Sequence, residues 1–160
     1  MGSLESQSTE DWQQIFQLNV LATSICTRET LKLLEKDGIE DGHIININSV
    51  AGHSNTALTI DGIGFYSGAK HMITAISKNL YTELAKKKSK IRVTSISPGI
   101  VSSRVVKQYK EALGENVKGT ALDAVLLECK DISDAVLYVV GSPPHVVITE
   151  LTIVPSGQIY

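Results

Sequence analysis

Two short β-branched segments, separated by one long amphipathic segment, constrain the fold of this chain most strongly. The segments "HIININS" (43–49) and "IRVTSIS" (91–97) have the length, composition and flanking glycine or proline that are typical of strands. Between them, apolar residues recur at helical spacing from about residue 65 to residue 88. A helical crossover of this length joins parallel strands, whereas antiparallel strands need only a short turn. The sequence therefore predicts an α/β layered sheet.

The same alternation of helix and strand continues on both sides of this unit. The remaining predicted elements are a helix over 9–37 capped by Ser8 or Thr9, weaker helices within 102–130, a helix from Asp131 or Ser133, and a strand over 149–155. Three strands are few for an open parallel sheet buried on both faces. We therefore expect one domain, 1–160, that represents part of a larger doubly wound sheet.

Composition excludes several classes of function. The chain has 160 residues, of which 42% are hydrophobic and 20% charged, and a net charge of -2 creates no broad field for nucleic acid or an anionic membrane. No apolar run approaches membrane-spanning length and no leader is visible, so we expect a soluble, cytoplasmic protein. The histidines lack zinc spacing, which predicts no metal site. Cys26 and Cys129 lie in apolar helical patterns and are expected to be buried.

Tyr66 and Lys70 stand four residues apart near the start of the helix predicted over 65–88, so their side chains are neighbours. A tyrosine with the ordinary pKa of about 10 is a poor base, and lowering that pKa to about 7 requires about 4 kcal/mol. One ammonium about 4 Å away supplies about 4 kcal/mol at an effective dielectric constant of about 20. Tyr66 is therefore a candidate general acid or base. The alternative is that this spacing marks an ordinary amphipathic edge.

Polar and glycine-containing segments follow the first two predicted strands. Ser49 ends one strand, and Pro98 and Gly99 follow the other. Ligands in open α/β sheets bind outside the carboxyl ends of the strands, so these residues should converge with the start of the helix over 65–88. Asn19 lies mid-helix, where asparagine disfavours the helix, and is either a surface residue or a bridge to that site.

In this order and spacing, "FQLNV", "GHIININSVAG", "FYSGAK" and "ISPGIV" resemble the second half of a short-chain dehydrogenase/reductase. The detail in "NVLATSICTRE" and "GHIININS" is most similar to the cytosolic NADP-dependent reductases of ketosteroids and farnesol-like alcohols. The resemblance covers nearly the whole chain. It implies a Rossmann-type fold and an oxidoreductase that interconverts a hydrophobic alcohol and its carbonyl by hydride transfer with NADP or NAD.

The resemblance also implies a role for individual residues. Tyr66 would be the acid/base, Lys70 would lower its pKa and bind the nicotinamide ribose, Ser49 would orient the substrate oxygen, and Asn19 would hold a water between Lys70 and solvent. The residues that would line the nicotinamide are Pro98, Gly99, Val101 and Ser103. The interval between Ser49 and Tyr66 is a few residues longer than usual, and the extra length is expected within 53–64, near the substrate.

The glycine-rich turn by which the family binds its dinucleotide, at a helix N-terminus after the first strand, has no counterpart in these residues. We therefore expect the main dinucleotide-binding segment to be absent from this chain. An unpaired sheet edge would then leave the chain marginally stable or insoluble alone.

Two alternative hypotheses remain open. In the first, the chain is an inactive fragment that forms a homo-oligomer or binds a full-length relative through the helices over 9–37 and 65–88, which commonly pair in this family. In the second, it is a doubly wound binding module of flavodoxin type, in which Tyr66 has no role.

Overall fold

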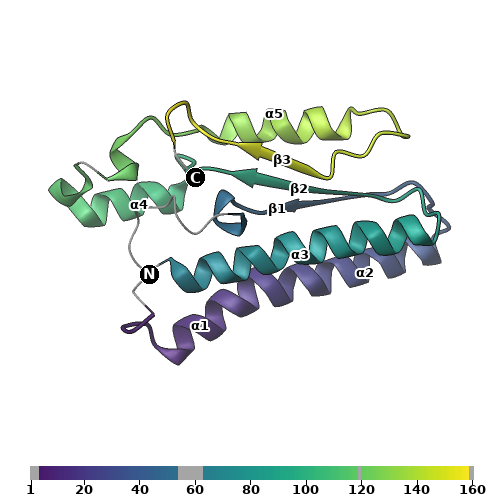
Figure 1. Cartoon of the computed structure of the whole chain (residues 1–160), viewed down its shortest axis with the longest axis horizontal. Helices are drawn as coiled ribbons and strands as arrows, with labels where there is room; N and C mark the ends of the chain where they lie inside the picture. Colours follow the sequence, from purple (N-terminus) through teal and green to yellow (C-terminus); the bar gives the residue numbers. More distant parts are fainter. Residues whose placement is uncertain (1–3, 54–62, 119, 159–160) are drawn as a thin grey trace.

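The computed structural model describes residues 4–53, 63–118 and 120–158. Three parallel strands form one sheet in the order β1 (His43–Ile47), β2 (Arg92–Pro98) and β3 (Glu150–Ile153). The helices α2 (Ala22–Lys36) and α3 (Gly64–Lys86) lie on one side of the sheet, and α5 (Cys129–Val140) lies on the other (Figure 1). This arrangement confirms the predicted α/β class, a partial Rossmann-type doubly wound parallel sheet.

The first helical region is interrupted, although its sequence predicts one continuous helix. It consists of α1 (Thr9–Phe16), a π-helical segment (Gln17–Leu21) and α2. The side-chain amide of Asn19 donates to the Ile15 carbonyl at 2.9 Å, which offers that carbonyl an alternative to its normal helical partner. Single π turns of this kind occur often at functional sites.

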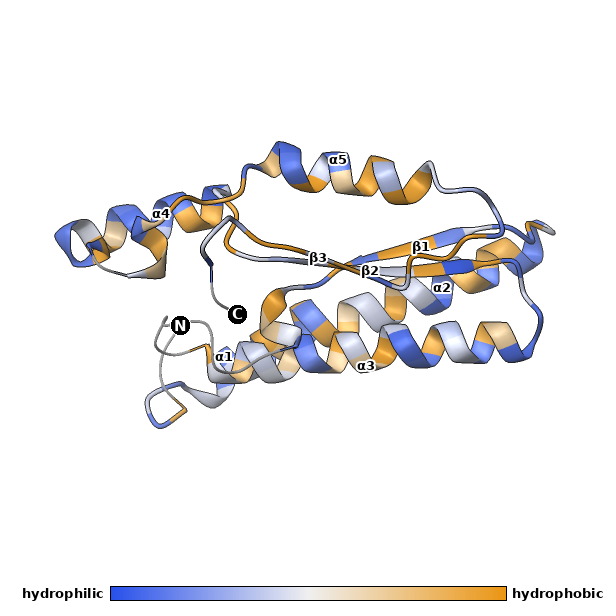
Figure 2. Ribbon diagram, turned by 45° about the horizontal axis from the view of Figure 1, so that its top comes forward, coloured by the Kyte–Doolittle hydropathy of each residue, from blue (hydrophilic) through white to orange (hydrophobic). Residues whose placement is uncertain are grey.

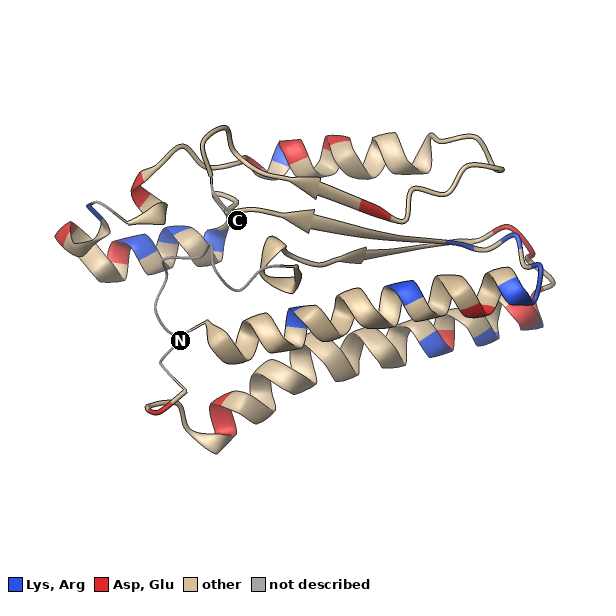
Figure 3. Ribbon diagram, viewed as in Figure 1, with Lys and Arg blue, Asp and Glu red and all other residues tan. Residues whose placement is uncertain are grey.

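A hydrophobic cluster joins the sheet to α3 near the amino ends of the strands. Ile44, Leu80, Leu84 and Val93 are its buried members, with 8%, 9%, 8% and 1% of their surface exposed. Figure 2 shows that hydrophobic residues are interspersed with polar ones along the strands. Among Lys, Arg, Asp and Glu, the three strands carry only Arg92 and Glu150 (Figure 3). Burial of apolar surface between layers therefore holds α3 on the sheet.

Beyond β2, the chain forms α4 (Arg104–Leu113) and two 3-10 turns, Gly114–Val117 and Ala121–Asp123, while another 3-10 turn, Val50–Gly52, follows β1. A second cluster, with Ile100, Val117 and Leu122 buried, anchors this region. The apolar residues of 102–128 thus divide between packing and the cavity described below.

Two sequence-based expectations about local structure are wrong. Cys26 and Cys129 are both exposed: Cys26 lines an open groove between α2 and β1, and Cys129 is the first residue of α5. The N-cap of α5 is Glu128, neither Asp131 nor Ser133, and the Asp131 carboxylate accepts from the Glu128 backbone N–H at 2.7 Å. The loop expected within 53–64 is described only at its ends, because residues 54–62 lie outside the described residues.

Within the described ranges, none of the helices combines the length and apolar character that crossing a bilayer requires.

Candidate functional site

A cavity of about 380 Å³ lies at the carboxyl ends of β1 and β2. Of the residues that the sequence predicts for a site, it is lined by Ser49, Tyr66, Pro98, Gly99, Val101 and Ser103. Its other walls are largely apolar and include Val105, Val106 and Leu122. The site therefore lies where open parallel sheets place their ligands.

Ser49 and Tyr66 reach the cavity from different elements. Ser49 caps the Val50–Gly52 turn, and its hydroxyl accepts from the Ala51 N–H at 3.2 Å. Tyr66 lies in the first turn of α3, and a hydrogen bond with the Ser49 side chain lowers the pKa of the phenol. A serine hydroxyl has one proton and two acceptor lone pairs, so it can serve both partners and a ligand oxygen.

Burial outweighs that hydrogen bond, so the pKa of Tyr66 is raised above its ordinary value of 10.0. This direction is opposite to the lowering that a neighbouring Lys70 ammonium would produce, so the role of Lys70 toward Tyr66 stays a prediction. The Lys70 ammonium lies over the aromatic ring, with Nζ 5.6 Å from the ring centroid. Burial also lowers the pKa of Lys70 itself.

Lys70 and Asn19 do not line the cavity. Lys70 is 9% exposed, and its ammonium donates to the Ile47 carbonyl at 3.4 Å, directly behind Tyr66. Asn19 is half-buried in the π-helical segment and donates to its own helix at Ile15. The structure thus places the Lys70 ammonium by the Tyr66 ring but leaves Asn19 bonded within its helix.

Gln158, near the C-terminus, hydrogen-bonds to the loop after β2. The Gln158 side-chain oxygen accepts from the Ile100 N–H at 3.0 Å, and a Cβ at position 99 would collide with that same oxygen. Gly99 therefore leaves room for the Gln158 side chain, which would have to move if position 99 carried a Cβ. Ser103 caps α4, with its hydroxyl accepting from the Val106 N–H at 3.4 Å.

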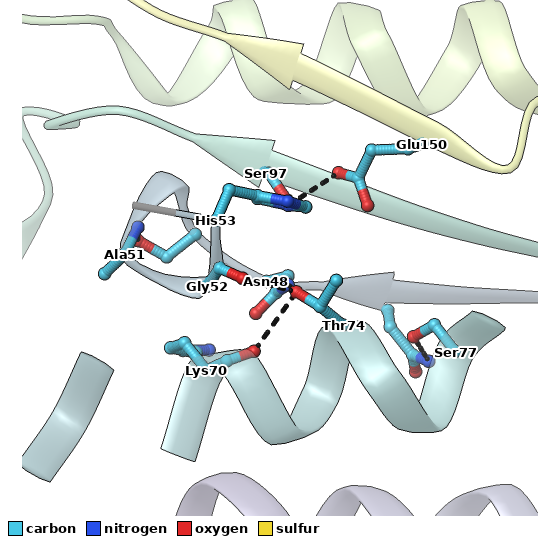
Figure 4. Close-up of polar contacts among 11 residues, drawn as sticks. Asn48, Ala51, Gly52, His53, Lys70, Thr74, Ser77, Ser97 and Glu150 are labelled. Atoms are coloured by element: carbon cyan, nitrogen blue, oxygen red, sulfur yellow. Dashed lines mark hydrogen bonds and ion pairs between the residues drawn. The ribbon is translucent and has the colours of Figure 1, made fainter. Parts of the chain in front are cut away.

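Sequence reasoning missed a polar cluster that joins the turn after β1 to β2 and β3. His53 Nε2 lies 2.9 Å from Ser97 Oγ and 3.4 Å from Glu150 Oε1 (Figure 4). Both contacts use one ring nitrogen and Ser97 is 0% exposed, so the cluster lacks the relay geometry of a hydrolytic Ser-His-acid triad. The three residues are far apart in the chain, and no local signal in the sequence connects them.

A family model described as short chain dehydrogenase matches residues 1–114, which include Asn19, Ser49, Tyr66 and Lys70. The chain belongs to the short-chain dehydrogenase family. The match thus includes both Ser49, at a strand end, and the pair Tyr66 and Lys70, one helical turn apart.

Curated short-chain dehydrogenases are similar to this chain over most of its length. Dehydrogenase/reductase SDR family member 11 of Gallus gallus is 39% identical over 156 residues, which cover 98% of this chain and 60% of the relative. Farnesol dehydrogenase of Aedes aegypti is 39% identical over 146 residues, covering 91% of this chain and 55% of that protein. The chain thus spans about three fifths of the length of these relatives.

Solved structures of short-chain dehydrogenases share the fold. The closed form of serine dehydrogenase complexed with NADP+ superimposes with a TM-score of 0.81 and 30% identity, covering 100% of this chain and 62% of that one. A 4-hydroxyisoleucine dehydrogenase complexed with NADH has a TM-score of 0.72 at 21% identity, which shows the fold alone. Both structures contain a nicotinamide dinucleotide.

Proposed function

We propose that this chain is the catalytic part of an NAD(P)-dependent oxidoreductase that interconverts a hydrophobic alcohol and its carbonyl. The observation that carries the proposal is that Ser49 and Tyr66 line the same apolar cavity at the carboxyl end of a parallel sheet. Similarity to a farnesol dehydrogenase supports a farnesol-like substrate, and a steroid-like one is the alternative. The valine and leucine side chains of the cavity suit such a ligand.

The residues present fit the nicotinamide end of such a cofactor. Pro98, Gly99 and Val101 supply a flat apolar wall, and Ser103 supplies a hydroxyl at the same end of the cavity. A bound nicotinamide would supply or accept the hydride. NADP is favoured by the serine dehydrogenase complex, and NAD remains the alternative.

The proposed roles of the side chains follow from their positions. Ser49 binds the substrate oxygen through its hydroxyl, and Tyr66 transfers a proton at its phenolic oxygen. Burial raises the pKa of Tyr66, so the phenol is protonated at neutral pH and suits proton donation to a carbonyl. Lys70, behind the ring, stabilises the phenolate that remains after the transfer.

The test is to titrate the purified chain with NADPH and NADH while following cofactor fluorescence, and then to measure reduction of hydrophobic ketones. We expect saturable binding and measurable turnover. Tyr66→Phe should lower kcat by about 100-fold or more and leave cofactor binding intact, because only the proton donor is removed.

Tyr81→Phe is the matched control, since Tyr81 lies on the same helix but is 38% exposed and outside the cavity. It should leave both binding and kcat unchanged. A folded chain that binds neither cofactor would contradict the proposal, as would equal activity of Tyr66→Phe and the wild type.

A second candidate function is assembly with another copy of this chain or with a longer relative. A groove of about 500 Å³ runs between α2 and α3 and exposes parts of Leu31, Ile76 and Leu80. Apolar side chains in a groove with a polar rim are typical of an association surface. This candidate is compatible with the first.

A further inference from the structure

Two asparagines at the end of β1 hydrogen-bond across the layers to two hydroxyls on α3. Asn46 donates to Ser77 Oγ at 2.9 Å, and Asn48 donates to Thr74 Oγ1 at 2.8 Å (Figure 4). The asparagines are two residues apart on a strand and the hydroxyls three apart on a helix, so each pair shares one face. All four residues are buried, which makes an unpaired amide here costly.

The Thr74 hydroxyl also lies close to two backbone carbonyl oxygens. It lies 2.9 Å from the Gly52 carbonyl and 3.3 Å from the Lys70 carbonyl of its own helix. A hydroxyl has one proton, and the shorter contact indicates donation to Gly52. Because the same oxygen accepts from Asn48, Thr74 holds the end of β1 and the following turn together.

The turn itself lies directly on the backbone of α3. A Cβ at Gly52 would be 2.7 Å from the Lys70 carbonyl oxygen and 2.9 Å from the Asn48 amide nitrogen. A second hydroxyl of α3, that of Ser67, donates to the Ala51 carbonyl at 2.8 Å. Ser49 begins this turn, so the contacts of Thr74 fix the position of Ser49 relative to the helix that carries Tyr66.

We infer that Thr74 is a positioning residue, whose hydroxyl joins Asn48, the Val50–Gly52 turn and α3 and thereby sets the distance between Ser49 and Tyr66. The inference rests on the proposed function, in which those two hydroxyls act on substrate. A shift of the strand by one residue would turn its asparagines away from α3 and leave buried amides unpaired. The polar pairs therefore hold β1 in register with α3.

Hydrogen exchange of the full chain tests this inference without requiring activity. The Gly52 N–H donates to Ser49 within the turn, and the Asn48 N–H donates to Ile96. In Thr74→Val, which preserves shape but removes the hydroxyl, both amides should exchange about tenfold faster relative to amides of β2. Thr74→Ser, which retains the hydroxyl, should restore most of the protection.

Thr82→Val is the matched control, because the exposed Thr82 hydroxyl bonds only the Lys78 carbonyl of its own helix. It should leave the exchange of Gly52 and Asn48 unchanged. Unchanged exchange in Thr74→Val, or an equal loss of protection throughout the sheet, would overturn the inference. If Thr74→Val does not fold, Asn48→Ala removes the other partner of the same hydrogen bond. The Gly52 amide should then exchange faster, and unchanged exchange would overturn the inference.

Activity provides a second and separable readout. Where the wild type reduces a carbonyl, Thr74→Val should lower kcat about tenfold with an unchanged KM for the cofactor, and Thr74→Ser should restore it. An unchanged kcat would count against Thr74 as a positioning residue. A wild type without activity would contradict the proposed function alone, since the exchange experiment still decides the role of Thr74.

Discussion

At the scale of single residues, burial determines the protonation of the polar groups around the site. It raises the pKa of Tyr66 and lowers the pKa of Lys70, and in both cases it favours the neutral form. An ion pair between the two side chains is therefore not the resting state of this chain. The neutral phenol is the form that the proton donation proposed for Tyr66 requires.

His43 shows the same effect at the other end of β1 and gives a prediction for stability. Burial, aided by the charge of Arg92, lowers the pKa of His43 below 6.5. The unfolded chain then binds a proton more readily than the folded one, so the folded state is fully favoured above about pH 6.5 and loses stability as the pH falls through the lowered value. Urea unfolding measured above and below that pH should show that His43→Gln loses less stability than the wild type as the pH falls.

Thr82→Val, at an exposed position without an ionisable side chain, supplies the control. It should reproduce the wild-type pH dependence of the free energy of unfolding. If the His43 variant loses stability with acid as steeply as the wild type does, desolvation of His43 does not contribute.

At the scale of elements, α3 performs two tasks along its length. Its first half carries Tyr66 and Lys70 of the site, and Thr74, which bonds Asn48 at the end of β1. Its second half carries Leu80 and Leu84, which pack in the hydrophobic cluster with the sheet. Packing of the apolar half against the sheet stabilises the helix and so keeps its polar half in position.

Leu84→Ala tests this division. Removing a buried leucine side chain from the cluster should lower the free energy of unfolding by about 2–5 kcal/mol, because it loses apolar burial and leaves a cavity. Chemical denaturation measures the change. Leu137→Ala on α5, where the side chain is 68% exposed, should change stability by less than about 0.5 kcal/mol. Similar losses for both leucines would contradict the assignment of the cluster.

At the scale of the whole molecule, the sheet and its helices leave surfaces without a packing partner among the described residues. The strand β1 pairs with β2 on one side only, and β3 likewise pairs only with β2. Edge strands with free backbone groups favour association. The groove between α2 and α3 adds an apolar surface to these edges.

We expect the chain to self-associate through that groove. Light scattering coupled to gel filtration should detect a dimer, and Ile76→Asp should shift it toward monomer, because a carboxylate in an apolar contact is costly to desolvate. Leu137→Asp, on the opposite side of the sheet, should leave the dimer unchanged. A dimer that survives the first variant and dissociates in the second would assign the interface to α5.

The sequence by itself determined the order of helices and strands, the parallel sheet, and the residues that face one another at its carboxyl edge. These follow from local spacing: β-branched runs favour strands, and apolar residues at helical intervals give the helices a face to bury. Ser49 and Tyr66 could be proposed for the same reason, since strand ends and helix starts converge in such a sheet, whereas Ser103 was proposed only from the resemblance to the family. The π turn around Asn19 was signalled only by an asparagine within a helix.

Only the tertiary structure decided which polar groups meet and how strongly each is buried. The Asn48–Thr74 and His53–Glu150 contacts join residues far apart in sequence, so no local pattern predicts them. The direction of the Tyr66 pKa shift depended on the same information. Spacing along a helix gives the distance to a charge, but the loss of water around the phenol, which raises its pKa, arises only when the layers pack together.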